Sequence, residues 1–184
     1  PYIVALNTNT PSADRRTIYS SDGTDVIAGA DLHFSIGSSA VGNLTYNPDF
    51  ATIEADRAVV NLTRYETYFG EKRLFFLEGA ELFRTYINVF HSRRIGNIDF
   101  GIKSNGRVGR FSYALISANE RASEEEIASY ATAFRLKRDV FGSSNVGFTI
   151  VSREFDGGYN RILSADATFQ LPINISIASQ VVGS

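Results

Sequence analysis

Residues 26–36 alternate between apolar and polar side chains, and this alternation restricts the fold more than any other feature of the sequence. One face of the stretch is apolar and carries Val26, Ala28, Ala30, Leu32, Phe34 and Ile36. The other face carries Gly29, Asp31, His33 and Ser35, with Ile27 as the exception. Because successive side chains of a β-strand point to opposite sides of the sheet, the pattern predicts a strand with one apolar and one polar face.

The same alternation recurs along the chain and predicts about nine strands. The longer candidates are residues 26–36, 98–103, 111–115, 130–137, 146–150, 163–171 and 173–177, and the shorter ones are 2–6 and 41–46. Several approach the ~9–11 residues that a tilted membrane strand requires. The chain is therefore predicted to be all-β.

Short and long connections alternate between these strands. The short ones are predicted turns at 37–39, 104–106, 139–144 and 171–172, and between them lie connections that are mostly longer, at 7–24, 48–96, 120–127 and 156–159. In an up-and-down arrangement all short turns lie at one end, which is typical of outer-membrane barrels. We therefore expect an up-and-down antiparallel transmembrane β-barrel, of which this chain is part of a single domain with about nine strands. A soluble β-sandwich is the alternative, because its strands alternate in the same way.

Composition argues against several other classes of protein. No apolar run reaches the ~18 residues of a spanning helix, so only strands are predicted to cross a membrane. The net charge of -2 gives no indication of nucleic-acid binding. The chain has no Cys and only two His, which excludes disulfides and argues against a zinc site. No cofactor is predicted.

Residues 47–96 do not alternate and form an inserted segment in the predicted barrel. Asn47 and Pro48 end the preceding strand, because proline cannot donate to a strand ladder. A short amphipathic helix is predicted to begin after Asp56 and to end at Gly70. Its apolar positions at helical spacing are Val59, Leu62, Tyr65 and Phe69. Such a long connection with its own helix usually has a function in a compact fold.

The segment carries seven acidic and seven basic residues, and this balance predicts a paired charge network. The candidate members, in the lumen or in a plug, are Glu54, Asp56, Arg57, Arg64, Glu66, Arg73, Glu78, Glu81, Arg93 and Arg94. Two arrangements are open. The segment either folds inward and partly fills the lumen, or it packs on itself as an outer loop.

Other residues that could carry chemistry have simpler explanations. Glu78 and Glu81 are three positions apart and could form a carboxylate pair for glycoside hydrolysis, but carboxylates in a charge network are far commoner. His33 and His91 could bind a metal together only if the fold brings them close. We therefore predict no catalytic residues and no metal site.

Three stretches carry a family resemblance: NPDFATIEADRAVVNLTRYETYFGEKRLFFLEGAELF at 47–83, HSRRIG at 91–96 and REFDGGYNRILSADATF at 153–169. They resemble a family of uncharacterised outer-membrane proteins of Bacteroidota. The resemblance implies a longer protein, in which an N-terminal carbohydrate-binding-module-like domain precedes a C-terminal membrane barrel, and it places this chain in the first part of the barrel. It also implies a location in the bacterial outer membrane, contact with its lipid, and a glycan or other outer-membrane proteins as partners. Leu74 departs from the family, where proline is expected.

Three functions follow from these observations. The leading hypothesis is an outer-membrane β-barrel that takes part in transport across that membrane or in glycan handling there. The second is a soluble β-sandwich carbohydrate-binding module, although Trp, a favoured residue for stacking on sugars, is absent. The third is an outer-membrane hydrolase with its site in residues 47–96.

Overall fold

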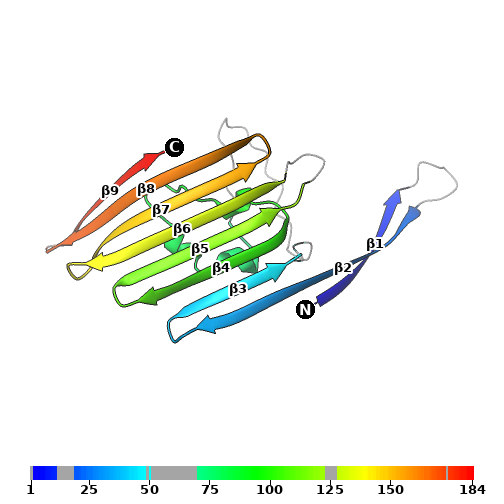
Figure 1. Cartoon of the computed structure of the whole chain (residues 1–184), viewed down its shortest axis with the longest axis horizontal. Coiled ribbons are helices and arrows are strands. Elements are labelled where there is room, and N and C mark those ends of the chain that lie inside the picture. The colour runs from blue at the N-terminus through cyan, green and yellow to red at the C-terminus, as the bar shows by residue number, and fades with distance from the viewer. Residues whose placement is uncertain (1, 12–18, 49, 51–69, 123–127, 173) are drawn as a thin grey trace.

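A computed structural model describes residues 2–11, 19–48, 50, 70–122, 128–172 and 174–184. The strands form one antiparallel sheet in which each strand pairs with its neighbours in the sequence, in the order β1 to β9 (Figure 1). The all-β, up-and-down prediction is thus confirmed. The first part of β2 pairs with β1 and the second part with β3.

All nine predicted strands are present, and most are longer than the alternation indicated. Their bounds are Tyr2–Pro11 (β1), Tyr19–Ile36 (β2), Ala40–Tyr46 (β3), Ile98–Val108 (β4), Phe111–Glu120 (β5), Ser129–Val140 (β6), Ser144–Phe155 (β7), Gly158–Leu171 (β8) and Ile175–Gly183 (β9). Within the described residues the sheet is open, because β1 and β9 each pair on one side only. The closed ring of a complete barrel is therefore not formed.

Three predicted connections are wrong. The predicted turn at 104–106 lies inside β4, where Gly106 pairs with Ala40 of β3. A Cβ atom added at Gly106 would lie 2.7 Å from the Ala40 Cα, so a side chain there would collide with β3. The chain reverses instead after Val108, where Gly109 has a φ of 61°. Residues 156–159 contain only a tight turn, and β1 and β2 extend into the predicted connection at 7–24.

The two ends of the sheet still differ in their connections. We call one end the turn end, because it holds the turns at 37–39, 109–110 and 141–143, and β8 ends and β9 begins there. At the other end lie Tyr46, Ile98, Glu120 and Ser129, where the strands before and after the longer connections end or begin, and the turn at 156–157; we call it the loop end. The short connections thus gather mainly at one end, as the up-and-down arrangement requires.

The convex face of the sheet is apolar and exposed. Leu32 is 57% exposed, Leu163 is 53% exposed and Phe148 is 40% exposed, and many of their neighbours on this face are similarly accessible. No second sheet covers them in the part of the chain that the structure describes. The large hydrophobic side chains of this face therefore do not pack into a dry interior within the described residues.

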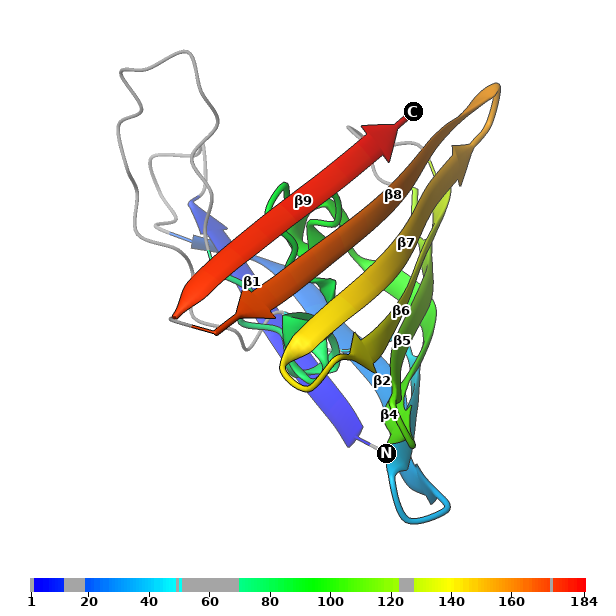
Figure 2. The same ribbon diagram turned by 90° about the vertical axis from the view of Figure 1, so that its left-hand side faces the viewer.

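The opposite, concave face holds residues 70–96 (Figure 2). This segment contains three short helices, α1 (Leu74–Leu77), η1 (Ala80–Phe83) and η2 (Ser92–Arg94). Phe76, Phe83 and Ile95 are buried against a patch of small and branched side chains on the strands, which consists of Ile98, Ala114, Ile116, Ala118, Ala131 and Ala133. The aromatic residues of the segment thus anchor it to the middle of the sheet.

Ile98 contradicts the predicted alternation, which placed it with Phe100 and Ile102 on the exposed face. The register of β4 and β5 shifts between Ile98 and Phe100. Such a bulge reverses the direction of side chains, so Ile98 is only 3% exposed and joins the core under Phe76. The predicted helix after Asp56 lies outside the described residues. None of the described helices has the length and apolarity needed to cross a membrane.

Candidate functional site: the concave face and its segment

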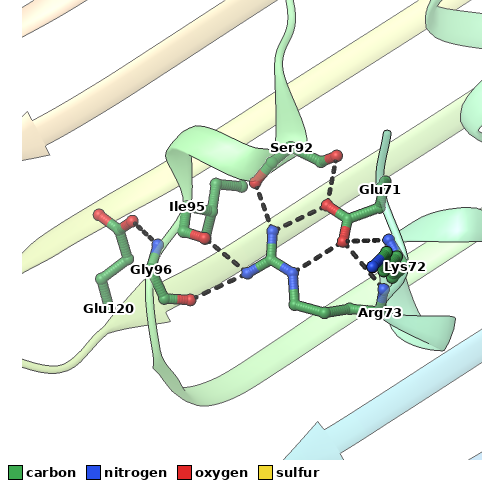
Figure 3. A network of polar contacts seen from close by, with 7 residues as sticks. All are labelled: Glu71, Lys72, Arg73, Ser92, Ile95, Gly96 and Glu120. Carbon is green, nitrogen blue, oxygen red and sulfur yellow. Dashed lines mark hydrogen bonds and ion pairs between the residues drawn. The ribbon is translucent and has the colours of Figure 1, made fainter. Parts of the chain in front are cut away.

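Arg73 is the centre of a network that fixes the shape of the segment (Figure 3). Its guanidinium donates to the carbonyl oxygens of Ser92, Ile95 and Gly96 at 2.8, 2.6 and 3.1 Å. It also donates to both carboxylate oxygens of Glu71, at 2.9 Å from Nε and 2.8 Å from Nη2. Because Arg73 is buried, these hydrogen bonds replace its lost water and join the start of the segment to its end.

Two aromatic rings enclose the same guanidinium. The Arg73 Cζ lies 4.2 Å from the ring centroid of Phe76 and 5.2 Å from that of Phe50, within the range of cation–π attraction. The Arg73 carbonyl accepts from the Phe76 and Leu77 amides at 3.0 and 3.1 Å, which starts α1. The local helix and the long-range network therefore depend on one residue.

Glu71 is the acidic partner in this network, and its side chain is only 8% exposed. Burial raises its pKa, but hydrogen bonds from the side chain and backbone of Arg73 and from the Ser92 hydroxyl outweigh burial and lower the pKa to about 2. The Ser92 hydroxyl donates to Glu71 Oε2 at 2.7 Å. Glu71 is therefore ionised at any physiological pH.

Glu120 connects the end of the segment to three strands. Its side chain, 2% exposed, accepts from the Gly96 amide at 2.7 Å and from Arg153 Nη2 at 2.8 Å. Arg153 also donates from Nε to the Ser129 hydroxyl at 3.0 Å. These contacts join β5, β6 and β7 to the backbone that follows η2.

Glu78 ties the middle of the segment to the first strands of the sheet. It accepts from Asn43 Nδ2 at 2.6 Å and from Lys103 Nζ at 3.2 Å, and the Lys103 side chain is 2% exposed. His33 Nδ1 lies 3.9 Å from the same carboxylate. The hydrogen bond from Asn43 and the contacts with Lys103 lower the pKa of Glu78, which argues against its use as a general acid in hydrolysis.

Arg135 and Asp166 form a buried ion pair beneath the segment. Arg135 on β6 reaches across Gly147 on β7 to Asp166 on β8, donating from Nη2 at 2.8 Å and from Nη1, and it donates to Thr149 Oγ1 at 2.9 Å. A side chain at Gly147 would place its Cβ 2.6 Å from Arg135 Cζ. The glycine thus leaves the space through which the arginine passes.

Gln180 on β9 binds the part of the segment around Ile87. Its amide nitrogen donates to the Ile87 carbonyl at 3.0 Å, and the Ile87 amide donates to its carbonyl oxygen at 2.6 Å. The same Gln180 nitrogen donates to the Ser164 hydroxyl at 2.8 Å. The segment is therefore hydrogen-bonded to strands at both sides of the concave face, from β3 to β9.

The structure brings together only some residues of the predicted network. Arg73 and Glu78 each have buried partners, whereas Glu81, Arg93 and Arg94 are exposed. The other five predicted members, Glu54, Asp56, Arg57, Arg64 and Glu66, lie outside the described residues. The list also missed the following partners: Glu71, Lys103, Glu120, Arg135, Arg153 and Asp166. The alternation places Lys103, Arg135, Arg153 and Asp166 on the polar face of the predicted strands, which indicates the side to which they point but not their partners.

Two cavities lie between the segment and the strands. One, of about 240 Å³, is lined by residues of both, including Tyr86, Arg135, Lys137, Asn145 and Thr168. The other, of about 380 Å³, is nearer the loop end and is lined among others by Phe90, Arg153 and Asn160. Residues 85–90 separate them, since Thr85 and Tyr86 line the first and 88–90 line the second.

The two histidines do not form a metal site with other side chains among the residues described. His33 lies beside Glu78, and no cluster of three or more His, Asp or Glu side chains suited to a metal occurs in the described part of the chain. His91 lies at the start of η2 and lines the larger cavity.

Comparison with known proteins gives one family. Neither the curated proteins nor the solved structures contain a match to this chain. Residues 1–126 match the family described as a domain of unknown function, DUF5916, and these residues include β1 to β5 and the whole segment on the concave face. Because the match covers more than half of the 184 residues, the chain belongs to the DUF5916 family.

Proposed function

We propose that this chain is part of a transmembrane β-barrel in the bacterial outer membrane, which takes part in passing a solute or polypeptide across that membrane. One observation carries the proposal: the large apolar side chains of the convex face are exposed, whereas Lys103, Glu120 and Arg135 on the concave face are buried. This is the reverse of a water-exposed sheet packed on a core, and it suits strands between lipid and a polar lumen. A barrel would close through strands beyond β1 and β9.

The apolar face forms a continuous band across the strands. Neighbouring strands place Leu44 opposite Ile102, Leu115 opposite Phe134, and Phe134 opposite Ile150. The band continues through the pairs Ile150–Leu163 and Phe169–Ile177 to β9. An exposed apolar area of this extent is unfavourable in water and favourable against acyl chains.

Aromatic residues lie at both ends of the band. Tyr46, Phe100, Tyr130 and Tyr159 lie toward the loop end, and each is at least 45% exposed. Phe111 and Phe141 lie at the turn end and are 43% and 84% exposed. Two aromatic girdles around an aliphatic band are typical of outer-membrane barrels, because these rings prefer the headgroup level.

The concave face supports a partly filled lumen. The ion pair Arg135–Asp166 and the Glu120 carboxylate are buried on this face, and a polar cavity remains beside residues 70–96. A segment that fills part of a lumen narrows the path for a solute. The segment is therefore proposed to determine which solutes pass.

Spin labels on the full-length protein in lipid vesicles test the proposal. The chain has no Cys, so single-cysteine variants add one label each within this region. Phe148→Cys and Ile177→Cys label the convex face, and the matched variants Asn145→Cys and Thr168→Cys label residues that line the concave cavity. We expect the convex labels to be relaxed by oxygen dissolved in lipid and the concave labels by a water-soluble nickel chelate.

The opposite outcome would refute the proposal. If the nickel chelate reaches the convex labels in vesicles as easily as the concave ones, the apolar face does not contact lipid. A full-length protein that stays folded and monomeric in plain buffer would lead to the same conclusion. It would then favour a β-sandwich in which a second sheet covers the apolar face.

A further inference from the structure

The turn end of the sheet carries basic side chains without acidic partners. Arg110 and Arg138 are both exposed, and neither forms an ion pair with any residue that the structure describes. Arg107 in the same region is neutralised, because its Nη2 lies 2.6 Å from Asp139 Oδ2. The guanidinium groups of Arg110 and Arg138 therefore have no acidic partner among the described residues.

These two arginines lie next to each other and next to exposed aromatic rings. The Asp139 amide donates to the Arg110 carbonyl at 2.9 Å, which places the β4–β5 turn beside the end of β6. Arg138 pairs in register with Phe111, and its Cζ lies 5.2 Å from the centre of that ring. Phe141, 84% exposed, follows in the next turn. We call Arg110, Phe111, Arg138 and Phe141 the basic-aromatic patch.

The patch lies on the side of the sheet that carries the apolar band. Arg138 continues the outward-facing row of Phe134 and Leu136 on β6, and Phe111 continues the row of Tyr113 and Leu115 on β5. Where the aliphatic residues of this band end, the patch begins. In a bilayer that covers the band, this is the depth of the lipid headgroups.

At the loop end, in contrast, arginines form ion pairs with acidic residues of the protein. Arg121 lies 2.5 Å from Asp99, and Arg161 lies 2.8 Å from Glu154, so the arginines there are paired within the protein. Arg161 also stacks over a ring, since its Cζ is 4.6 Å from the centre of Tyr159. Aromatic rings thus occur at both ends, whereas unpaired guanidinium groups occur at the turn end of the described sheet.

We infer that the basic-aromatic patch binds the phosphate group of an anionic phospholipid at the turn end of the barrel. A guanidinium donates two parallel hydrogen bonds to a phosphate, and neighbouring rings hold the glycerol region of the lipid. This inference rests on the proposed function, because it requires the apolar band to lie in a bilayer. It adds a specific lipid partner. It also places the turn end of the barrel in the leaflet that holds this lipid and the loop end in the other leaflet.

The test uses the full-length protein in detergent with phosphatidylglycerol and phosphatidylcholine supplied together, and native mass spectrometry counts the lipids retained. Wild type is expected to retain phosphatidylglycerol preferentially. In the variant Arg110→Gln/Arg138→Gln the preference for phosphatidylglycerol over phosphatidylcholine should fall about fivefold for each arginine removed. The matched control Arg121→Gln/Arg161→Gln, which changes two arginines at the loop end, should keep it.

Equal preference in wild type and in Arg110→Gln/Arg138→Gln would overturn the inference, as would an equal loss in the control. Displacement of the lipid from wild type by inorganic phosphate alone would also overturn it, because the patch would then be a site for free phosphate. Vesicle insertion separates this inference from the proposed function. A protein that inserts without selecting phosphatidylglycerol refutes the lipid site alone, whereas one that never inserts refutes both.

Discussion

The convex and concave faces of this sheet follow opposite rules of burial. Phe148 and Leu163 are 40% and 53% exposed on the convex face, whereas Lys103 and Arg135 are each 2% exposed on the concave face. In a protein that folds in water, burying a charge is costly and exposing a large apolar side chain gains nothing. The comparison teaches that buried polar networks, together with the anchors Phe76 and Phe83, hold residues 70–96 on the concave face, whereas no second sheet in the described chain covers the large apolar side chains of the convex face.

The concave face should be most sensitive at Arg73. Arg73→Ala leaves the buried Glu71 carboxylate without its cation and three carbonyl groups without a donor. Breaking a buried pair in this way costs about 3–5 kcal/mol. Denaturant unfolding of the vesicle-inserted protein measures the loss. Arg84→Ala, at the exposed residue that follows η1, serves as the control, and an equal effect of both variants would show that the network is not stabilising.

Acid should weaken the same network. The pKa of Glu71 is lowered from 4.5 to about 2 in the folded protein, so the unfolded chain takes up its proton first as the pH falls. The stability that Glu71 contributes is complete above pH 4.5 and is lost as the pH falls toward 2, by about 3 kcal/mol in total. Glu71→Gln should have a correspondingly shallower decrease of unfolding free energy in this range. A decrease of the same slope in both proteins would rule out this role for Glu71.

A charge on the convex face should destabilise the protein only in lipid. Phe148→Arg places a guanidinium among apolar side chains of the band and is expected to cost about 2–4 kcal/mol of unfolding free energy in vesicles. Thr168→Arg on the concave face, beside a polar cavity, should cost much less. If the two variants are equally stable in vesicles, the convex face does not contact acyl chains and the contrast between the faces has another origin.

The smallest effect is expected at Gln180. Gln180→Ala removes two hydrogen bonds to the Ile87 backbone, which together hold the far side of the segment. Each such bond contributes about 0.5–1.5 kcal/mol, so the Ile87 amide should exchange its hydrogen at least about fivefold faster. Ser179→Ala, next to it on β9, is the control. Unchanged exchange at Ile87 would mean that other contacts hold residues 85–90 in place.

Local sequence patterns predicted the strands well and the turns less well. Alternation identified all nine strands, because a period of two is imposed by backbone geometry. The residues Ser104, Asn105 and Gly106 have turn composition but continue β4, since pairing with β3 outweighs a local preference. Ile98 was assigned to the wrong face, because a bulge between β4 and β5 leaves no trace in the alternation.

The candidate site could be predicted only in outline. The balance of charges in residues 47–96 indicated a paired network, and Arg73 and Glu78 are paired in the structure. The pairing of Glu78 with Lys103 was not foreseeable, because these two residues are 25 positions apart in the sequence. A single sequence gives no distance between residues on different strands.

The sequence by itself determined the strands, their two unlike faces and the up-and-down order, because these depend on side-chain alternation and on short connections. Only the tertiary structure decided that the segment lies on the concave face and that Phe76 and Ile95 bury themselves on the alanines of β5 and β6. The physical reason is that curvature, register and packing arise between strands, where the partners of Arg135 and Glu120 come from neighbours distant in the chain.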